Sequence, residues 1–292
     1  MSNSKTILVT GANGQLGSEV KAISVNYTNY NFLFVGKDDL LIDDYIAVEN
    51  FFQNNNIDIC INCAAYTAVD KAESEPEKAF AINAHGASNL ATQCQYYNAQ
   101  LIHISTDYVF NGNATQPIKE DEPTNPIGIY GVSKLKGEEL VRQVNPSAII
   151  IRTSWVYSSF GNNFVKTMIR LMNERESISV VNDQIGKPTY ARDLAEAILK
   201  LVVAHPILDI KSSILHYSNS GNPISWYDFA IAINKKINSK CVVNAIPTSS
   251  YPTPAKRPVY SVLDTTKIEK ELDITIANWE DGLERCLTLL NR

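Results

Sequence analysis

The sequence predicts an α/β protein with a Rossmann-type, doubly wound parallel sheet, followed by a smaller mixed α/β C-terminal lobe that binds the substrate. Two observations carry this prediction. Short β-branched apolar runs alternate with helical stretches up to Trp155, and the first run stops at a glycine-rich turn. Strands that alternate with helices are joined by right-handed crossovers, which produce a parallel sheet. After Trp155 the alternation fades, so we expect a dinucleotide-binding domain at 1-155 and a substrate-binding lobe at 156-292, with part of 176-206 packing back on the first domain.

The composition is that of a globular protein without nucleic-acid or membrane partners. The chain has 292 residues, of which 45% are apolar and 20% are charged, so it can bury a full core. Its net charge of -5 argues against nucleic acids and anionic membranes, because binding to both depends on accumulated lysine and arginine. No apolar stretch approaches the ~18 residues of a membrane span, and the cysteines are scattered. We therefore expect a cytoplasmic protein.

A glycine turn follows the first predicted strand, which covers 6–10. The turn reads Gly11-Ala12-Asn13-Gly14-Gln15-Leu16-Gly17, and a helix begins near Gln15. Glycines let the backbone approach a pyrophosphate, and the helix N-terminus directs free N–H groups at the negative charge. This context predicts a dinucleotide site at Gly11, Gly14 and Gly17, with a purely structural tight turn as the alternative.

The residues after the second strand, at 32–35, indicate which cofactor is used. An acid at that position would accept a hydrogen bond from the ribose 2′-hydroxyl of NAD. The chain instead continues with Gly36 and Lys37, and the lysine would attract a 2′-phosphate. The pattern favours NADPH, with NADH also used, although Asp38 and Asp39 follow at once and oppose this preference.

The later strands place small and polar residues at the carboxyl edge of the sheet, where ligands of doubly wound folds bind. The third strand leads into Ala64-Ala65-Tyr66-Thr67, which would let a cofactor lie close. The fourth leads into Thr106 and Asp107, where a substrate carbonyl could be held, and the fifth leads into Trp155, an aromatic shelf. These three strands are predicted at 57–63, 100–105 and 148–152, and helices at 43–54, 76–97, 132–143, 160–173, 192–204, 225–237 and 279–290.

Tyr130 and Lys134 lie four residues apart at the start of a predicted helix and therefore share one of its faces. A nearby ammonium favours the phenolate form of tyrosine, so this pair could donate a proton to a carbonyl oxygen. The same spacing occurs by chance on solvated helices. The glycine turn and the residues after the fourth strand raise its weight as a catalytic pair.

Loops of the C-terminal lobe carry polar residues that could contact sugar hydroxyls and phosphates. They are Asn162, Asn163, Gln184, Lys187, Lys256 and Arg257. Solvation at the surface explains each of them equally well. Of this set, Arg257 is the candidate for substrate binding.

With these features in one chain, the sequence resembles the extended short-chain dehydrogenases/reductases. Within that superfamily it looks like the dTDP-4-dehydrorhamnose reductase family along nearly its whole length. The most specific blocks are A-V-D-K-A-E and R-T-S-W-V-Y, whereas the glycine turn is shared across the superfamily. The matching blocks are 11–17, 64–73, 105–110, 130–134, 152–157, 161–164, 182–184 and 252–255.

The resemblance implies reduction of the 4-keto group of dTDP-4-dehydro-L-rhamnose by NAD(P)H, the last step towards dTDP-L-rhamnose. Tyr130 would donate the proton, Lys134 would orient the nicotinamide ribose and lower the tyrosine pKa, and Thr106 would hydrogen-bond the carbonyl. Asp107 and Trp155 would contact the sugar. The positions that match the family's cofactor contacts are Gly14, Gln15, Leu16, Ala65, Tyr66 and Thr67, with Leu41 and Ile42 near the adenine.

Two departures from the family's pattern bear on binding. Leu41 stands where relatives usually have an aspartate, so only packing or backbone contact to the adenine remains. Some relatives bind Mg²⁺ between subunits through glutamates; Glu19 matches one of them, but Arg192 stands in another's place. The sequence therefore predicts no metal site and argues against a metal-bridged dimer, while another kind of homodimer stays open.

Three other functions stay open. Nucleotide-sugar 4,6-dehydratases use an Asp-Glu pair after the strand-four threonine, whereas this chain has Asp107 and Tyr108. A 4-epimerase would hold NAD tightly while the sugar rotates. The same fold also serves as a non-catalytic regulatory subunit, as in the methionine adenosyltransferase beta subunit. The intact set of Thr106, Tyr130 and Lys134 favours an enzyme over such a subunit.

Overall fold

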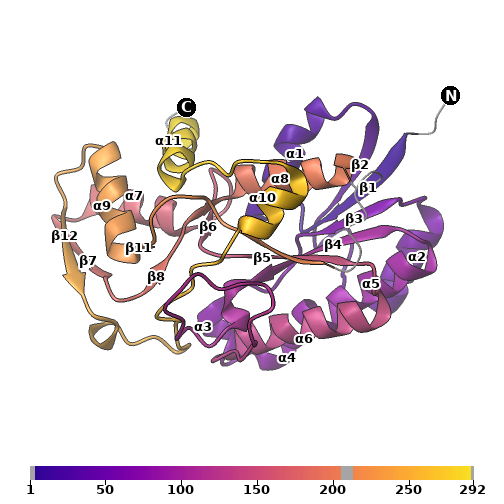
Figure 1. The fold of residues 1–292 in the computed structure, drawn as a ribbon, viewed down its shortest axis with the longest axis horizontal. Helices are drawn as coiled ribbons and strands as arrows, with labels where there is room; N and C mark the ends of the chain where they lie inside the picture. The colour runs from indigo at the N-terminus through magenta and orange to yellow at the C-terminus, as the bar shows by residue number, and fades with distance from the viewer. Residues whose placement is uncertain (1–3, 205–212, 291–292) are drawn as a thin grey trace.

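The computed structural model describes residues 4–204 and 213–290 and contains a six-stranded sheet (Figure 1). The strand order is β10-β5-β4-β3-β1-β2, and all neighbours are parallel. This confirms the predicted fold class, and it places the reversal of strand order at β1, between β2 and β3. The strands are β1 Lys5–Thr10, β2 Tyr30–Val35, β3 Ile59–Asn62, β4 Gln100–Thr106, β5 Ile149–Thr153 and β10 Ile214–Tyr217. The predicted domain ranges include 1–3, 205–212 and 291–292, which lie outside the described residues.

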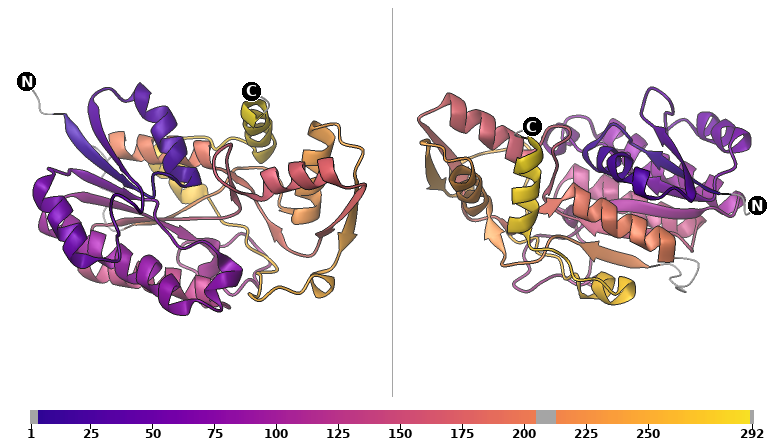
Figure 2. Two further views of the ribbon diagram at one scale, coloured as in Figure 1. Left: turned by 180° about the vertical axis from the view of Figure 1, so that it is seen from behind. Right: turned by 90° about the horizontal axis from the view of Figure 1, so that it is seen from above.

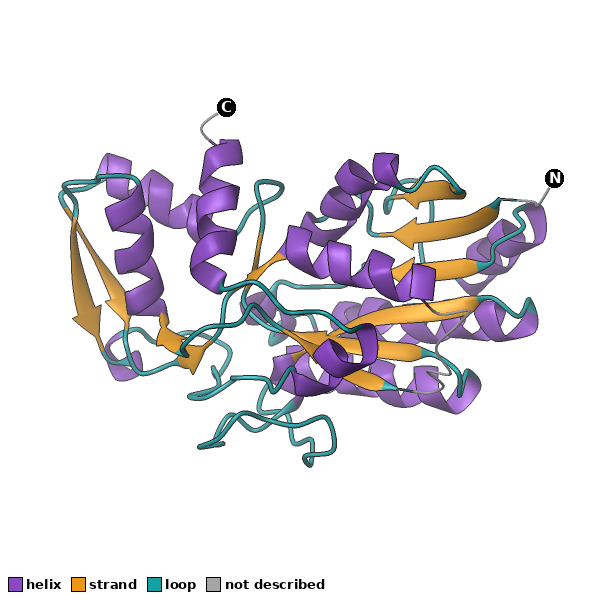
Figure 3. Ribbon diagram, turned by 45° about the horizontal axis from the view of Figure 1, so that its top comes forward, coloured by secondary structure: helices purple, strands orange, loops and turns teal. Residues whose placement is uncertain are grey.

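Helices cover both faces of the sheet. Successive residues of a strand point to opposite faces, so each strand contributes side chains to both cores. Ile7 and Val9 of β1 join the core under α1 and α8, whereas Leu8 joins the core under α2, α5 and α6. Figures 1 and 3 show the sheet between these two layers. The layer helices are α1 Gln15–Ile23, α8 Ala191–Ala204, α2 Tyr45–Asn54, α5 Ala87–Tyr96 and α6 Ile129–Val144.

The predicted helix at 76–97 contains a π-helical turn. Its parts are α4 Pro76–Phe80, the π-helical segment Ala81–Gly86 and α5. Helix α6 packs directly on this turn, because a Cβ at Gly137 would overlap the carbonyl oxygen of Asn83. The π-helical turn thereby holds the middle of α6 in place.

The smaller lobe has its own core, which includes Tyr157, Phe229 and Trp279. Figure 3 shows the strands of the large sheet pointing towards this lobe, and Figure 2 shows the two parts from behind and from above. The lobe contains α7 Phe164–Glu174, α9 Trp226–Lys236, α11 Trp279–Leu290, β6 Val156–Tyr157, β7 Ser177–Val181, β8 Ile185–Gly186, β9 Thr189–Tyr190, β11 Ile224–Ser225 and β12 Val242–Ile246.

The chain returns to the sheet after the predicted boundary at residue 155. Strand β10 pairs with β5, helix α8 lies against α1, and α10 adds Ile268 to the same core. Within 176-206, β7 stays in the lobe while α8 joins the sheet layer. The large sheet therefore contains elements from both sides of residue 155. The division into 1-155 and 156-292 stays a prediction. The remaining helices are α3 Val69–Ala72, α10 Thr266–Leu272 and the 3-10 turns Ser24–Asn26, Asp107–Val109 and Thr248–Ser250.

Among the helices in 4–204 and 213–290, none combines the length and apolar character needed to cross a membrane.

Candidate active site

The glycine turn lies where β1 meets the end of β3. Gly11 has a φ of 63°, and a Cβ there would lie 2.6 Å from the backbone nitrogen of Ala64. Gly14 is the N-cap of α1 and has no side chain with which to cap the first-turn N–H groups. Those groups therefore have no side-chain cap, which is the arrangement that the predicted phosphate contact requires.

Gln15 and Leu16 have different surroundings, although both match cofactor positions. The Gln15 Oε1 accepts a hydrogen bond from Asn163 Nδ2 of the smaller lobe at 2.9 Å. The Leu16 side chain is buried in the core under α1. Any contact from Leu16 to a cofactor would therefore be made by its backbone.

The turn after β2 corrects one premise of the cofactor prediction. Lys37 is exposed, as expected, but the Asp39 Oδ2 accepts a hydrogen bond from the Gly36 N–H at 2.8 Å. A carboxylate therefore does lie at the end of this strand. It belongs to Asp39, which the turn brings back to Gly36, and not to the residue that directly follows the strand. Further on, Leu41 is 57% exposed, whereas Ile42 is buried.

Asn83 fixes the segment after β3 and was missed by the sequence analysis. Its Oδ1 accepts from the Tyr66 N–H at 2.8 Å, and its Nδ2 donates to the Tyr66 carbonyl at 3.1 Å and to Ser133 Oγ at 3.0 Å. Ala64 and Ala65 before this clamp are partly exposed, and Thr67 after it is exposed. An asparagine in the middle of a predicted helix is the one sequence signal for this role.

Tyr130 and Lys134 share a face of α6, which begins earlier than predicted and so includes the tyrosine. Lys134 is buried and donates from Nζ to the carbonyl of Ile104 at 2.7 Å. Burial lowers the pKa of Lys134 to about 8. The ammonium is thus poorly solvated and directed at a backbone oxygen.

The pKa of Tyr130 differs from the sequence-based expectation. Burial raises it above the ordinary value, and the neighbouring Thr106 hydroxyl lowers it only in part, while Asp107 and Tyr108 add to the increase. Desolvation of the phenol is the largest effect on this pKa, and Lys134 is not among the groups that shift it, so the predicted depression by Lys134 is not seen. At neutral pH, Tyr130 is therefore a protonated donor.

Thr106 and Asp107 lie together at the end of β4. The Thr106 Oγ1 donates to Asp107 Oδ1 at 2.9 Å and accepts from the Tyr108 N–H at 3.2 Å. Within the described residues, Asp107 Oδ2 is buried without a hydrogen-bond partner. Burial raises the pKa of Asp107 to about 6, and hydrogen bonds from the Thr106 and Ser261 side chains to its carboxylate oppose the rise in part. An unpaired buried carboxylate oxygen at this edge is suited to accept from a sugar hydroxyl.

Trp155 lies between the sheet and the smaller lobe. Its backbone has a φ of 49°, and its ring stacks on Trp226 with centroids 3.5 Å apart and an interplanar angle of 6°. A Cβ at Gly186 would lie 2.5 Å from the indole, so the glycine leaves room for the ring. The side chain is partly exposed. It therefore contacts the lobe and still offers a surface at the edge.

Arg257 is paired with two groups of the sheet domain. Its Nη2 lies 2.6 Å from Asp70 Oδ2, and its Nη1 donates to the Tyr108 hydroxyl at 3.2 Å. The Tyr108 ring meets the Tyr130 ring edge-on, with centroids 5.4 Å apart. Arg257 thus lies at the same edge as the proposed donor. Gln184, another lobe candidate, donates to Thr248 Oγ1 at 3.0 Å.

Glu19 is buried where α1 meets the smaller lobe. Ser158 donates to its Oε1 at 2.6 Å, and Arg192 Nη1 lies 3.9 Å from Oε2. Burial raises the Glu19 pKa. Across 4–204 and 213–290, no cluster of three or more His, Cys, Asp or Glu side chains is placed to hold a metal ion. The arrangement of Glu19 is that of an internal link between helix α1 and its neighbours.

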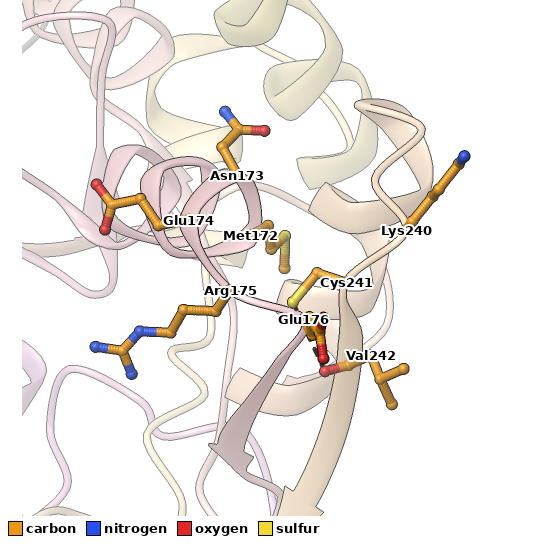
Figure 4. Close-up of a pocket in the computed structure, with 8 residues that line it drawn as sticks. All are labelled: Met172, Asn173, Glu174, Arg175, Glu176, Lys240, Cys241 and Val242. Carbon is orange, nitrogen blue, oxygen red and sulfur yellow. Dashed lines mark hydrogen bonds between the residues drawn. The ribbon is translucent and has the colours of Figure 1, made fainter.

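A surface pocket lies apart from these groups, between the end of α7 and the segment that enters β12 (Figure 4). Figure 4 shows the charged ends of Arg175 and Lys240 pointing away from it. The predicted site residues do not line this pocket, so it is separate from the candidate active site. Its lining consists of Met172, Asn173, Glu174, Arg175, Glu176, Lys240, Cys241 and Val242.

Known proteins resemble the chain along nearly its whole length. The family model described as the RmlD substrate binding domain matches residues 5–292. The spore coat polysaccharide biosynthesis protein SpsK of Bacillus subtilis (strain 168) is 44% identical, over 96% of each chain. A dTDP-4-dehydrorhamnose reductase of Aggregatibacter actinomycetemcomitans is 40% identical, over 95% of this chain and 97% of its own. The structure of dTDP-4-dehydrorhamnose reductase from Bacillus anthracis str. Ames in complex with NADP has a TM-score of 0.93 and 41% identity, covering 98% of this chain and 99% of its own.

Proposed function

Because the chain belongs to the family of the RmlD substrate binding domain, we propose that it reduces the 4-keto group of dTDP-4-dehydro-L-rhamnose with NADPH, giving dTDP-L-rhamnose. One observation carries the proposal. A phenol, an ammonium and a hydroxyl, from Tyr130, Lys134 and Thr106, meet at the carboxyl edge of a parallel sheet beside a glycine turn. This set provides proton donation and dinucleotide binding in one place.

The turn suits a dinucleotide, because Gly11 and Gly17 let the backbone pack tightly against Ala64 and against the turn itself, and Gly14 leaves the N–H groups of α1 without a side-chain cap. When bound, the nicotinamide supplies the hydride. Lys134 would hold the nicotinamide ribose through its ammonium. NADPH is the preferred cofactor, with NADH also used.

Tyr130 is the proton donor in this proposal. A carbonyl carbon that receives a hydride leaves negative charge on its oxygen, so a donor beside that oxygen stabilises the transition state more than the ground state. The raised pKa of Tyr130 keeps its proton in place at neutral pH. Thr106 would donate to the same oxygen by turning its hydroxyl proton away from Asp107 Oδ1 when the substrate binds.

The substrate's sugar and phosphates would be bound at the edge shared with the smaller lobe. Asp107 offers a carboxylate oxygen that is unsatisfied among the described residues, and Trp155 offers a partly exposed ring. Arg257 has N–H groups beyond those that bind Asp70 and Tyr108, and these suit the diphosphate. We place the reaction in the cytoplasm, since free cysteine thiols suit a reducing compartment.

The test is a coupled spectrophotometric assay. The protein is incubated with NADPH or NADH and dTDP-4-dehydro-6-deoxyglucose, with and without a 3,5-epimerase, and absorbance at the nicotinamide band is followed. We expect cofactor oxidation that depends on the epimerase, with dTDP-L-rhamnose as the product. Equal oxidation without the epimerase would identify a different keto-sugar as the substrate, and the absence of turnover would favour a non-catalytic binding subunit.

A further inference from the structure

The block A-V-D-K-A-E at 68–73 contains neither the predicted donor nor a predicted cofactor contact, yet two of its carboxylates reach the surroundings of Tyr130. The block includes the short helix α3, which lies against α6. Ala72 is buried in a small apolar cluster on which Ile129 and Tyr130 pack. This packing fixes one side of the tyrosine and brings Asp70 and Glu73 close to it.

Glu73 caps the helix that carries Tyr130. The N-cap of α6 is Gly128, which has no side chain to satisfy the first-turn N–H groups. Glu73 Oε1 accepts from the Ile129 N–H at 2.8 Å, so a carboxylate from another segment takes that role. A negative charge at a helix N-terminus also interacts favourably with the helix dipole. The backbone is thus fixed one residue before the proposed donor.

Asp70 acts on the neighbouring ring through a chain of three contacts. Its Oδ2 lies 2.6 Å from Arg257 Nη2, and its Oδ1 accepts from the Ala255 N–H at 3.3 Å. Arg257 Nη1 then donates to the Tyr108 hydroxyl at 3.2 Å, and the Tyr108 ring meets Tyr130 edge-on at 5.4 Å with an angle of 75°. Asp70 thereby holds both the loop of the smaller lobe and the ring beside Tyr130.

We propose that Asp70 and Glu73 are positioning residues for the Tyr130 hydroxyl. Glu73 sets the position of the α6 backbone, and Asp70 sets the Tyr108 ring through Arg257. The inference rests on the proposed function, because it requires Tyr130 to be the proton donor. Proton transfer demands a donor within hydrogen-bond reach of the carbonyl oxygen, and a misplacement of about 1 Å can cost about 10²-fold in rate.

The test measures kcat, the substrate KM, NADPH affinity and Tm for Glu73→Ala, Glu73→Gln and Asp70→Ala. We expect both alanine variants to lower kcat by about 10- to 100-fold, with NADPH affinity within about twofold of wild type, because the glycine turn is untouched. Glu73→Gln keeps an acceptor oxygen and should recover most of kcat. Glu77→Ala, an exposed glutamate in the next helix, is the matched control and should behave as wild type.

The decisive arm repeats Glu73→Ala and Asp70→Ala in a Tyr130→Phe background. A residue that acts through the phenol should have no further effect on kcat once the hydroxyl is gone, so the effects should be non-additive. An unchanged kcat in the single variants, or the same fall in kcat in both backgrounds, would overturn the proposal. Full activity of Tyr130→Phe would instead overturn the proposed function, so the two failures are distinguishable.

Discussion

The carboxyl edge of the sheet and the smaller lobe hold their site residues in different ways. At the edge, Lys134 and Thr106 are buried and bonded to nearby backbone, Lys134 to Ile104 and Thr106 to Tyr108, while Tyr130 beside them is partly exposed. The lobe reaches the site through a few long-range links between side chains, such as Arg257 with Asp70 and Trp155 with Trp226.

The comparison indicates that the two regions have different roles in catalysis and in substrate binding. Buried groups with shifted pKa values, such as Lys134 and Asp107, belong to the sheet edge, where chemistry needs fixed geometry. The lobe contributes aromatic and charged surfaces suited to recognising a sugar and its phosphates. We therefore expect substitutions at the edge to act mainly on kcat and pH dependence, and those in the lobe to act mainly on KM.

Lys134→Met should lower kcat/KM more than the Asp107, Trp155 and Asp39 variants described below. The residue is proposed to hold the nicotinamide ribose and so to position the hydride, so kcat/KM should fall by about 10²-fold or more and NADPH affinity should fall with it. Lys136→Met, an exposed lysine on the same helix, is the control. Loss of NADPH affinity with an unchanged kcat would limit Lys134 to binding.

Lys134 also predicts the alkaline limb of the pH profile. With a folded pKa of about 8, the ammonium is present below that pH and is lost as pH rises through it. The kcat/KM of the wild type should therefore decline above about pH 8, and Lys134→Met should lack this decline. An unperturbed lysine would keep its charge to about pH 10.4, so a profile that stays flat to pH 10 would contradict the assignment.

Asp107→Asn tests the acid side of the sheet edge. The pKa of about 6 means that the carboxylate is charged above that pH and protonated below it. If the charged form accepts a hydrogen bond from the sugar, kcat/KM should rise as pH increases through about 6. The asparagine variant should lose this limb and about 10- to 100-fold in kcat/KM, as expected for a hydrogen bond to a charged group. An acid limb that persists in Asp107→Asn would assign it to another group.

Trp155→Ala tests whether the stacked contact between the sheet edge and the lobe acts on substrate binding. The ring is partly exposed yet stacked on Trp226, so we expect KM to rise by about tenfold and the free energy of unfolding to fall by about 2 kcal/mol. Trp226→Ala removes the same stacking from the lobe side and should lower stability with a smaller change in KM. If both variants lose stability and neither changes KM, Trp155 only fills the space between the two parts.

Asp39→Asn should have the smallest effect. The Asp39 carboxylate lies at the end of β2, where it opposes a 2′-phosphate, while exposed Lys37 favours one. Removing the negative charge should raise the preference for NADPH over NADH by a few-fold, about 1 kcal/mol at most for a solvated charge. Lys37→Ala should change the ratio of the two affinities in the opposite direction. Equal changes for both cofactors would remove these residues from cofactor discrimination.

Local pattern was sufficient to predict five strands of the sheet and the helix face shared by Tyr130 and Lys134. Strand β10 was not predicted, because its place in the sheet depends on pairing with β5, which is distant in sequence. Period and spacing describe neighbours in sequence, whereas that pairing joins distant segments. The hydrogen bonds around the site also join distant segments. For this reason the fold could be predicted more completely than these hydrogen bonds.

Three side chains of the candidate site show what sequence spacing cannot predict. Asn83 clamps Tyr66, Glu73 caps α6, and Asp39 turns back to the end of β2. The partners of Asn83 and Glu73 are distant in sequence and depend on the path of the chain, whereas Asp39 bonds Gly36 within a single turn, whose geometry the strand pattern does not give. The raised pKa of Tyr130 has a similar origin, because burial outweighs the charge that the Tyr-x-x-x-Lys spacing emphasises.

The most direct test of the central claim is the single-turnover rate of NADPH oxidation in Tyr130→Phe, measured beside the wild type with saturating dTDP-4-dehydro-L-rhamnose. The substitution keeps the ring and its edge-on contact with Tyr108 and removes only the hydroxyl. If Tyr130 donates the proton, the rate should fall by about 10²–10⁴-fold while NADPH affinity and Tm stay unchanged. Tyr96→Phe, at an exposed tyrosine, should keep the wild-type rate. A Tyr130→Phe protein that oxidises NADPH as fast as the wild type would contradict the claim.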